Sequence, residues 1–348
     1  MITHYFAACY ADGRTIGRAP GMAVRHAALA AAAMLLLPGL AGAQGSTGQP
    51  AEPAPKFRSS VDLVSVAAVV RDRKGRFVSD LSREDFIVVE GGEPRKIVGF
   101  EAERDGPVKL AVLFDISGSM RVGSRALDAR QAAKHLFGAL KPGDQAALFS
   151  FDTRLDQVHG FTTDFGGLES AIARVESPYG QTSLYDAIAE TARVVGEQAG
   201  GTDGRLPQRA AVVVLTDGVD TKSRLTPPEV SGIASSIDVP IYVIAVMAPI
   251  DDPARLQEEN VISGALKDLA TWTGGELFVA SAPAHASIAS RQIVDELRNQ
   301  YLLAFEASTR QGWVPLEIKS RKRNLTVRAR TGYLVGNNRS SMSPVPDR

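Results

Sequence analysis

The sequence has 348 residues, 44% of them hydrophobic, and its 39 lysine and arginine residues balance 39 aspartate and glutamate residues. This composition, with a single cysteine, is typical of an ordinary globular protein and excludes a disordered, collagen-like or disulfide-stapled chain. A formal net charge of zero gives no reason to expect nucleic-acid binding, and the length suffices for about two domains.

The N-terminus has the pattern of a secretory signal peptide. Positive charges that end at Arg25 precede an apolar run at 27–37, and small residues follow that run. The pattern predicts that residues 1–43 are a signal peptide cleaved after Ala43. The mature protein is then expected in the periplasm or outside the cell.

An uncleaved membrane anchor is the alternative interpretation of this segment, and membrane contact is expected only in that case. The apolar run is shorter than the roughly 20 residues that a membrane span needs, so cleavage is the expectation. Whether translation starts at Met1 or at Met22 stays open. Cleavage would also remove Cys9, the only cysteine, and with it any disulfide, thiolate metal site or cysteine nucleophile.

A Gly-, Pro- and Gln-rich linker at 44–56 precedes a segment of β-strand patterns at 57–106. Within this segment the expected strands span residues 61–71, 86–90 and 96–101. These strands are too few to form a stable sheet on their own.

Between residues 107 and 300, apolar strands alternate with amphipathic helices. The expected strands span residues 109–115, 145–151, 210–216, 241–246 and 276–280. The expected helices span residues 124–140, 167–175, 183–198, 227–236, 262–273 and 287–300. This alternation predicts an α/β domain with a doubly wound, Rossmann-like, mostly parallel sheet that helices cover on both faces.

Strand patterns return after the α/β block, and a polar tail follows at 336–348. The expected strands span residues 301–307, 314–320 and 325–331. Because neither β segment can form a stable sheet alone, we expect 301–335 to pair with 57–106 in one small β-sandwich. The α/β domain would then be inserted in this sandwich, or flanked by it.

Basic residues gather in and around the last strands. The set is Lys319, Arg321, Lys322, Arg323, Arg328 and Arg330. An acidic partner or an anionic lipid is one interpretation. We favour the simpler one, in which these charges lie on the solvent face of an edge hairpin and keep it from pairing with other chains.

Polar side chains gather in loops that we place at the carboxyl ends of the central strands, where ligands of such sheets bind. The residues are Asp115, Ser117, Ser119, Thr182 and Asp217. Taken singly, each could cap a helix or stabilise a turn, but that interpretation does not explain the combination. Two carboxylates and three hydroxyls form an all-oxygen set that suits a hard divalent cation, Mg²⁺ first, with Mn²⁺ or Ca²⁺ as alternatives.

With these five residues the sequence resembles the von Willebrand factor type A family and its metal-ion-dependent adhesion site, whose signature is DxSxS followed by a later Thr and a later Asp. The resemblance covers 109–300. It implies that the three hydroxyls and two carboxylates hold the metal with one coordination position open. A protein partner would fill that position with a Glu or Asp side chain. The stretches "EDFIVVE" and "RTGYL" also resemble a bacterial group of exported proteins related to this family.

A non-enzymatic binding module is therefore our expectation for the function. The alternatives are a secreted Mg²⁺-dependent hydrolase and a structural envelope protein. Against a hydrolase, the sequence places no obvious general base beside the motif and contains no GxSxG or phosphate-binding glycine loop. Asp152 and Asp220 lie on neighbouring loops, where we expect them to act as turn or cap residues.

Overall fold

The computed structural model describes most of the chain after residue 62. The described ranges are 63–102, 106–176, 180–200, 206–247, 264–308 and 310–335. The expected signal peptide, linker and polar tail lie outside these ranges, as does the start of the helix expected at 262–273. Within the described ranges, none of the helices is both long enough and apolar enough to span a membrane.

A six-stranded sheet forms the centre of the α/β domain, with the strand order β10-β9-β8-β5-β6-β7. The strands are β5 Val108–Asp115, β6 Gln145–Phe151, β7 Leu155–Thr162, β8 Arg209–Thr216, β9 Ile241–Val246 and β10 Leu277–Ala280. Every strand pair is parallel except β6 with β7. All residues of β5, β8 and β9 are buried, as expected for parallel strands covered on both faces.

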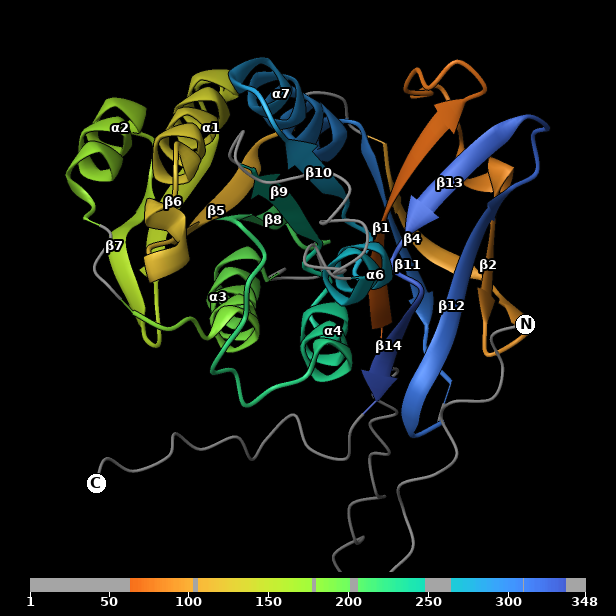
Figure 1. Cartoon of the computed structure of the whole chain (residues 1–348). Coiled ribbons are helices and arrows are strands. Elements are labelled where there is room, and N and C mark those ends of the chain that lie inside the picture. The colour runs from red at the N-terminus through yellow and green to blue at the C-terminus, as the bar shows by residue number, and fades with distance from the viewer. Residues whose placement is uncertain are drawn as a thin grey trace, which may run out of the picture. The chain divides into compact units, whose positions relative to one another are not determined.

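Helices cover both faces of this sheet (Figure 1). They are α1 Arg125–Ala139, α2 Phe165–Arg174, α3 Leu184–Ala199, α4 Pro227–Ser236, α6 Gly264–Trp272 and α7 Pro283–Arg298. Alternate side chains of β5 enter two separate apolar cores. Leu110 packs on the face covered by α1, α2 and α7, whereas Leu113 packs on the face covered by α3, α4 and α6.

Strands from before and after the α/β block pair with each other in two four-stranded sheets, β13-β1-β11-β4 and β14-β12-β2-β3. Their bounds are β1 Leu63–Asp72, β2 Phe86–Glu90, β3 Glu93–Arg95, β4 Ile97–Glu101, β11 Gln300–Glu306, β12 Gly312–Ser320, β13 Leu325–Ala329 and β14 Gly332–Val335. Val66 lies opposite Leu303, and Val88 lies opposite Ile318. These four side chains belong to one shared core, so the predicted fold class is confirmed.

Several elements differ from the sequence expectations. The short strands β3 and β14 were not among the expected strands. Strand β7 was not expected, because its sequence, LDQVHGFT, is polar and none of its residues is fully buried. It is the antiparallel edge strand of the central sheet, where a solvated face needs few apolar residues. The last helix also starts at Pro283 rather than at residue 287, with proline in the first turn, where its missing N–H costs nothing.

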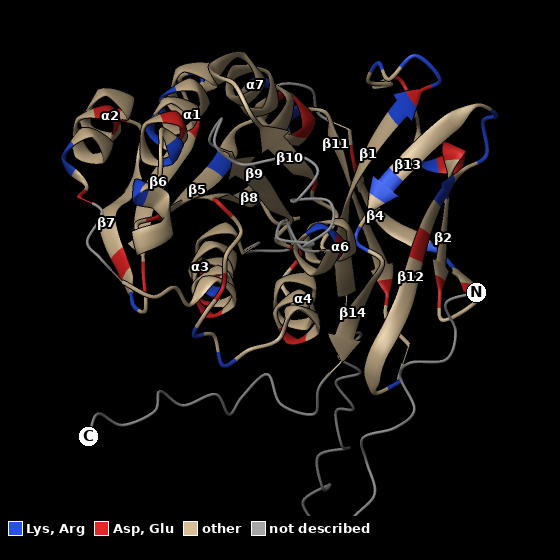
Figure 2. Ribbon diagram, viewed as in Figure 1, with Lys and Arg blue, Asp and Glu red and all other residues tan. Residues whose placement is uncertain are grey.

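The expectation that all six basic residues face solvent was wrong for two of them. Figure 2 shows basic residues on β13 and in the loop that precedes it. Arg328 of β13 contacts Glu276 and Glu296 of the α/β domain. Arg330 is buried, with its Nε 3.5 Å from Oδ1 of Asp238. These two arginines therefore join the sandwich to the α/β domain, and the other four basic residues are exposed.

Candidate metal centre

The predicted site lies at the carboxyl edge of the central sheet. Strand β5 ends at Asp115, and β8 ends at Thr216, directly before Asp217. The amide of Gly118, in the first loop, donates a hydrogen bond of 3.0 Å to the carbonyl oxygen of Gly180, in the loop that leads to α3. The amide of Thr221, which follows Asp217, donates a hydrogen bond of 3.0 Å to the carbonyl oxygen of Thr182, so hydrogen bonds connect the three loops that carry the predicted residues.

Asp115 is fully buried at the centre of this edge. Its Oδ1 accepts a hydrogen bond of 2.8 Å from the amide of Ser117, and its Oδ2 accepts one of 2.5 Å from the hydroxyl of Thr216. Burial raises the pKa of Asp115 to about 6; these hydrogen bonds offset part of the shift, and the negative charge of Asp217 adds to it. A nearby positive charge would favour the ionised form of Asp115.

The two serines of the first loop lie next to each other. Ser117 precedes a short 3-10 helix, η2 (Gly118–Arg121), and its Oγ is 3.1 Å from Oγ of Ser119. Ser117 is buried and Ser119 is half-buried. Each hydroxyl has two lone pairs, so this mutual contact leaves acceptor capacity for a cation.

The side-chain hydroxyl of Thr182 is the atom of the site that bears most directly on metal binding. Its Oγ1 is buried and has no hydrogen-bond partner among the described residues. The backbone around it is firmly held, because the amide of Thr182 donates a hydrogen bond of 2.9 Å to Oγ1 of Thr221. A buried hydroxyl without a partner costs about 1–3 kcal/mol unless a ligand or a water molecule satisfies it, and its lone pairs are able to bind a cation.

Asp217 contacts a residue that sequence reasoning missed. Its Oδ1 accepts a hydrogen bond of 3.2 Å from the amide of Val219, and its Oδ2 accepts one of 2.8 Å from Nη1 of Arg125. The same Nη1 donates to the carbonyl oxygen of Ser119 at 3.1 Å. The sequence offers no signal for this contact, because an arginine at the start of a helix is usually solvated.

The donor set fits a hard divalent cation. No group of three or more His, Cys, Asp or Glu side chains in the described part of the chain could hold a metal ion. A metal at this edge would therefore need hydroxyl oxygens as well as the two carboxylates. Two buried carboxylates, a serine pair and an unpartnered threonine hydroxyl provide such oxygens.

The family-model comparison agrees with this geometry. Residues 110–219 match the model described as the von Willebrand factor type A domain. The chain contains a von Willebrand factor type A domain. Domains of this family are protein-interaction modules, and the match includes all five predicted site residues.

Solved structures similar to the chain include other von Willebrand A proteins. An aerotolerance-related membrane protein from Bacteroides fragilis has 19% identity and a TM-score of 0.44, over 55% of this chain and 98% of that one. A von Willebrand factor type A protein from Catenulispora acidiphila has 15% identity and a TM-score of 0.41, over 80% and 76%. Proximal thread matrix protein 1 from the mussel byssus, described with a zinc-occupied site of this type, has 19% identity and a TM-score of 0.42, over 60% and 49%. No curated protein matches the sequence.

The two further aspartates have the turn and cap roles that we expected. Oδ1 of Asp152 accepts a hydrogen bond of 2.9 Å from the amide of Arg154, which closes the turn after β6. Oδ1 of Asp220 accepts one of 2.8 Å from the amide of Leu184, the first residue of α3. Asp220 thus holds the start of the helix that follows Thr182.

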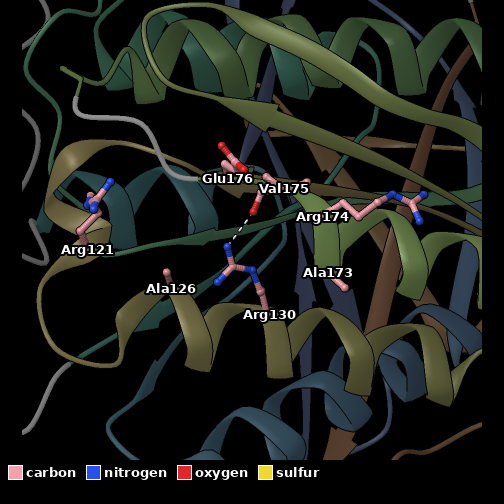
Figure 3. A pocket seen from close by; sticks show the side chains of 7 residues that line it. All are labelled: Arg121, Ala126, Arg130, Ala173, Arg174, Val175 and Glu176. Atoms are coloured by element: carbon pink, nitrogen blue, oxygen red, sulfur yellow. Dashed lines mark hydrogen bonds between the residues drawn. The ribbon is translucent and has the colours of Figure 1, made fainter.

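An open cleft of about 980 Å³ begins at Arg121, the last residue of η2 (Figure 3). Its lining residues are Arg121, Ala126, Arg130, Ala173, Arg174, Val175 and Glu176. Arg130 reaches from α1 across the cleft, and its Nη2 donates a hydrogen bond of 2.6 Å to the carbonyl oxygen of Val175. Three arginines against one glutamate make the lining basic.

Proposed function

We propose that the protein is an exported, metal-dependent protein-binding module. One Mg²⁺ would be held by the five predicted residues, Asp115, Ser117, Ser119, Thr182 and Asp217. When bound, the metal supplies an open coordination position for a Glu or Asp side chain of a protein partner. The observation that carries the proposal is the buried, unpartnered Oγ1 of Thr182 at the same sheet edge as two buried carboxylates.

The charge of the site supports an acidic ligand. The two carboxylates balance the charge of a divalent ion and leave part of its coordination shell to a ligand from outside. Arg121 is the last residue of η2, so the basic cleft starts two residues after Ser119. Its arginines would favour further acidic residues that flank the coordinating side chain.

The contacts of the site favour binding over hydrolysis. Among the described residues, Thr216 and Arg125 donate side-chain hydrogen bonds to the two carboxylates. Arginine stays protonated in proteins, and the Thr216 hydroxyl already donates its proton to Asp115. Neither group can act as a general base, and the two carboxylates would themselves be engaged by the metal, so we propose a module without catalytic activity.

Export follows from the pattern at 1–43 and stays a proposal. N-terminal sequencing of the protein purified from its native cells should start near Gln44. Recovery of Met1 or Met22 in a membrane fraction would contradict cleavage.

The decisive test of metal binding replaces Thr182 by valine, which keeps the shape of the side chain and removes its oxygen. We expect the Mg²⁺ affinity measured by calorimetry to fall about tenfold or more, which corresponds to ~1.4 kcal/mol. Stability in EDTA should not fall, because the hydroxyl of Thr182 makes no hydrogen bond within the described structure.

Thr191→Val is the matched control. Its Oγ1 is buried in α3 and donates a hydrogen bond of 2.8 Å to the carbonyl oxygen of Ala187. Loss of that bond should lower stability by about 1 kcal/mol and leave the Mg²⁺ affinity unchanged. Equal metal affinity in wild type and Thr182→Val would contradict the assignment.

Partner chemistry is tested with a glutamate-rich peptide and a glutamine-rich peptide of the same length. The glutamate peptide should bind in Mg²⁺ and be released by EDTA, whereas the glutamine peptide should not bind in either buffer. Binding of the glutamate peptide that survives EDTA would show that recognition does not depend on the metal.

A further inference from the structure

We propose that Arg125 is a tethered cation that competes with the metal for Asp217 and thereby sets the metal affinity of the site. The inference rests on the proposed metal centre and adds a residue that holds no metal itself. Arg125 is the first residue of α1 and lies outside the five residues of the family motif.

The guanidinium of Arg125 lies against atoms that belong to the proposed centre. Its Nη1 is 2.8 Å from Oδ2 of Asp217 and 3.1 Å from the carbonyl oxygen of Ser119. The side chains of Arg125 and Asp217 are only 14% and 2% exposed. Water therefore screens this ion pair far less than it screens a pair on the surface.

The two oxygens of Asp217 are not equivalent. Oδ1 faces the backbone and accepts the amide hydrogen of Val219. Oδ2 instead accepts a hydrogen bond from the guanidinium of Arg125. A guanidinium and a divalent ion at the same carboxylate oxygen repel each other, so a metal that uses Oδ2 must displace the arginine or bind against its charge.

The charge balance of the site also indicates that Arg125 opposes metal binding. Asp115 and Asp217 together carry two negative charges when ionised, and Arg125 neutralises one of them without a metal. This pairing stabilises the metal-free fold, because it leaves no isolated carboxylate at Asp217. It also removes part of the attraction that would draw a divalent cation into the site. The side chain of Arg125 thus raises the stability of the metal-free protein and lowers its affinity for the metal.

Calorimetric titration of the full chain with MgCl₂ and MnCl₂ tests the inference. Arg125→Gln should bind the metal about tenfold more tightly than wild type. It should also melt at a lower temperature in EDTA, and saturating metal should raise its melting temperature by more than that of wild type. Arg125→Met retains most of the aliphatic stem without the charge and should behave in the same way, so the test does not depend on one variant folding well.

Lys134→Gln is the control for loss of one positive charge on the same helix. Lys134 is exposed on α1, and its replacement should leave the metal affinity within about twofold of wild type, because solvent and salt screen it. In wild type, the NMR signal of the Arg125 Nε–H group should shift and exchange faster with water when Mg²⁺ is added. A purely structural salt bridge would not respond in this way.

The outcomes separate the inference from the function on which it rests. If wild type binds metal and both Arg125 variants bind it equally or more weakly, the inference is wrong and the proposed function stands. If wild type fails to bind but the Arg125 variants bind, the competition is supported in its strongest form. If neither wild type nor any Arg125 variant binds Mg²⁺ or Mn²⁺, both proposals are overturned.

Discussion

Two buried acidic sites in this protein differ in how the pKa of their carboxyl groups responds to burial. In the sandwich, Oε1 of Glu90 accepts hydrogen bonds from the Tyr333 hydroxyl and from the amide of Ser308, and Oε2 accepts one of 2.6 Å from Arg95. At the proposed metal edge, both oxygens of Asp115 are likewise hydrogen-bonded. Each site also has one buried hydroxyl without a partner among the described residues, that of Ser308 beside Glu90 and that of Thr182 near Asp115.

The pKa values of Glu90 and Asp115 shift in opposite directions. Burial alone would raise the pKa of Glu90, but the hydrogen bonds from Tyr333, Ser308 and Arg95 outweigh it and hold the pKa below its usual value. At Asp115 burial prevails and raises the pKa to about 6. The chain itself thus stabilises the ionised form of Glu90, whereas Asp115 retains a cost of desolvation that a cation at the proposed site would offset.

The largest expected effect concerns the metal edge. Asp217→Ala should lower the Mg²⁺ affinity about a thousandfold, or ~4 kcal/mol, because it removes one of the two proposed charged ligands. Calorimetric titration measures the change. Asp156→Ala, on the exposed edge strand β7, removes the same charge and should leave the affinity unchanged. An unchanged Mg²⁺ affinity in Asp217→Ala would show that Asp217 does not bind the metal.

The second largest expected effect is that of Glu90→Ala. This variant should lower the free energy of unfolding by about 3 kcal/mol, because the buried donors around Glu90 lose their acceptor. Urea unfolding at pH 7 measures it. The exposed Glu317 of β12, which pairs with Lys319, is the control, and Glu317→Ala should cost less than about 1 kcal/mol. Metal affinity should be the same in both variants, since the sandwich holds neither metal ligand.

The lowered pKa of Glu90 also predicts how the stability of the protein changes with pH. The pKa of Glu90 in the folded protein lies below its ordinary value of 4.5, so the unfolded chain takes up the proton first as the pH falls. Its contribution to stability is complete above about pH 4.5 and is lost as the pH falls through the folded pKa. Glu90→Gln should lack this component, so the stability difference between wild type and variant should shrink between pH 5 and pH 3, as followed by urea unfolding. A constant difference would contradict the assignment.

The smallest expected effect concerns the basic cleft. Arg121→Gln and Arg174→Gln should each weaken binding of a glutamate-rich peptide about two- to fivefold at low salt, because exposed charges contribute little and are screened. Their metal affinity should stay close to that of wild type. Fluorescence anisotropy of the peptide at 20 mM and 200 mM salt measures peptide binding by the two variants. A loss of peptide affinity that does not decrease with salt would argue against an electrostatic role of the arginines.

Sequence patterns were enough to predict five of the six strands of the central sheet, because the apolar strands and amphipathic helices between residues 107 and 300 differ clearly in period. They also placed the five proposed site residues in loops at the carboxyl ends of strands, where the structure has Asp115 and Asp217. The shared sandwich followed from a count of strands that could not be stable alone. Each of these inferences depends on local pattern or on a simple stability requirement.

Other features were decided only by the tertiary structure. Arg125 contacts Asp217, which is 92 positions away in the sequence, and Thr216 contacts Asp115 across 101 positions. Arg328 belongs to a strand pattern that suggested exposure, yet it lies against Glu296 because the sandwich packs on the α/β domain. Polar and charged side chains have no periodicity that reveals their partners, and each partner is determined by which loops and layers the fold brings together.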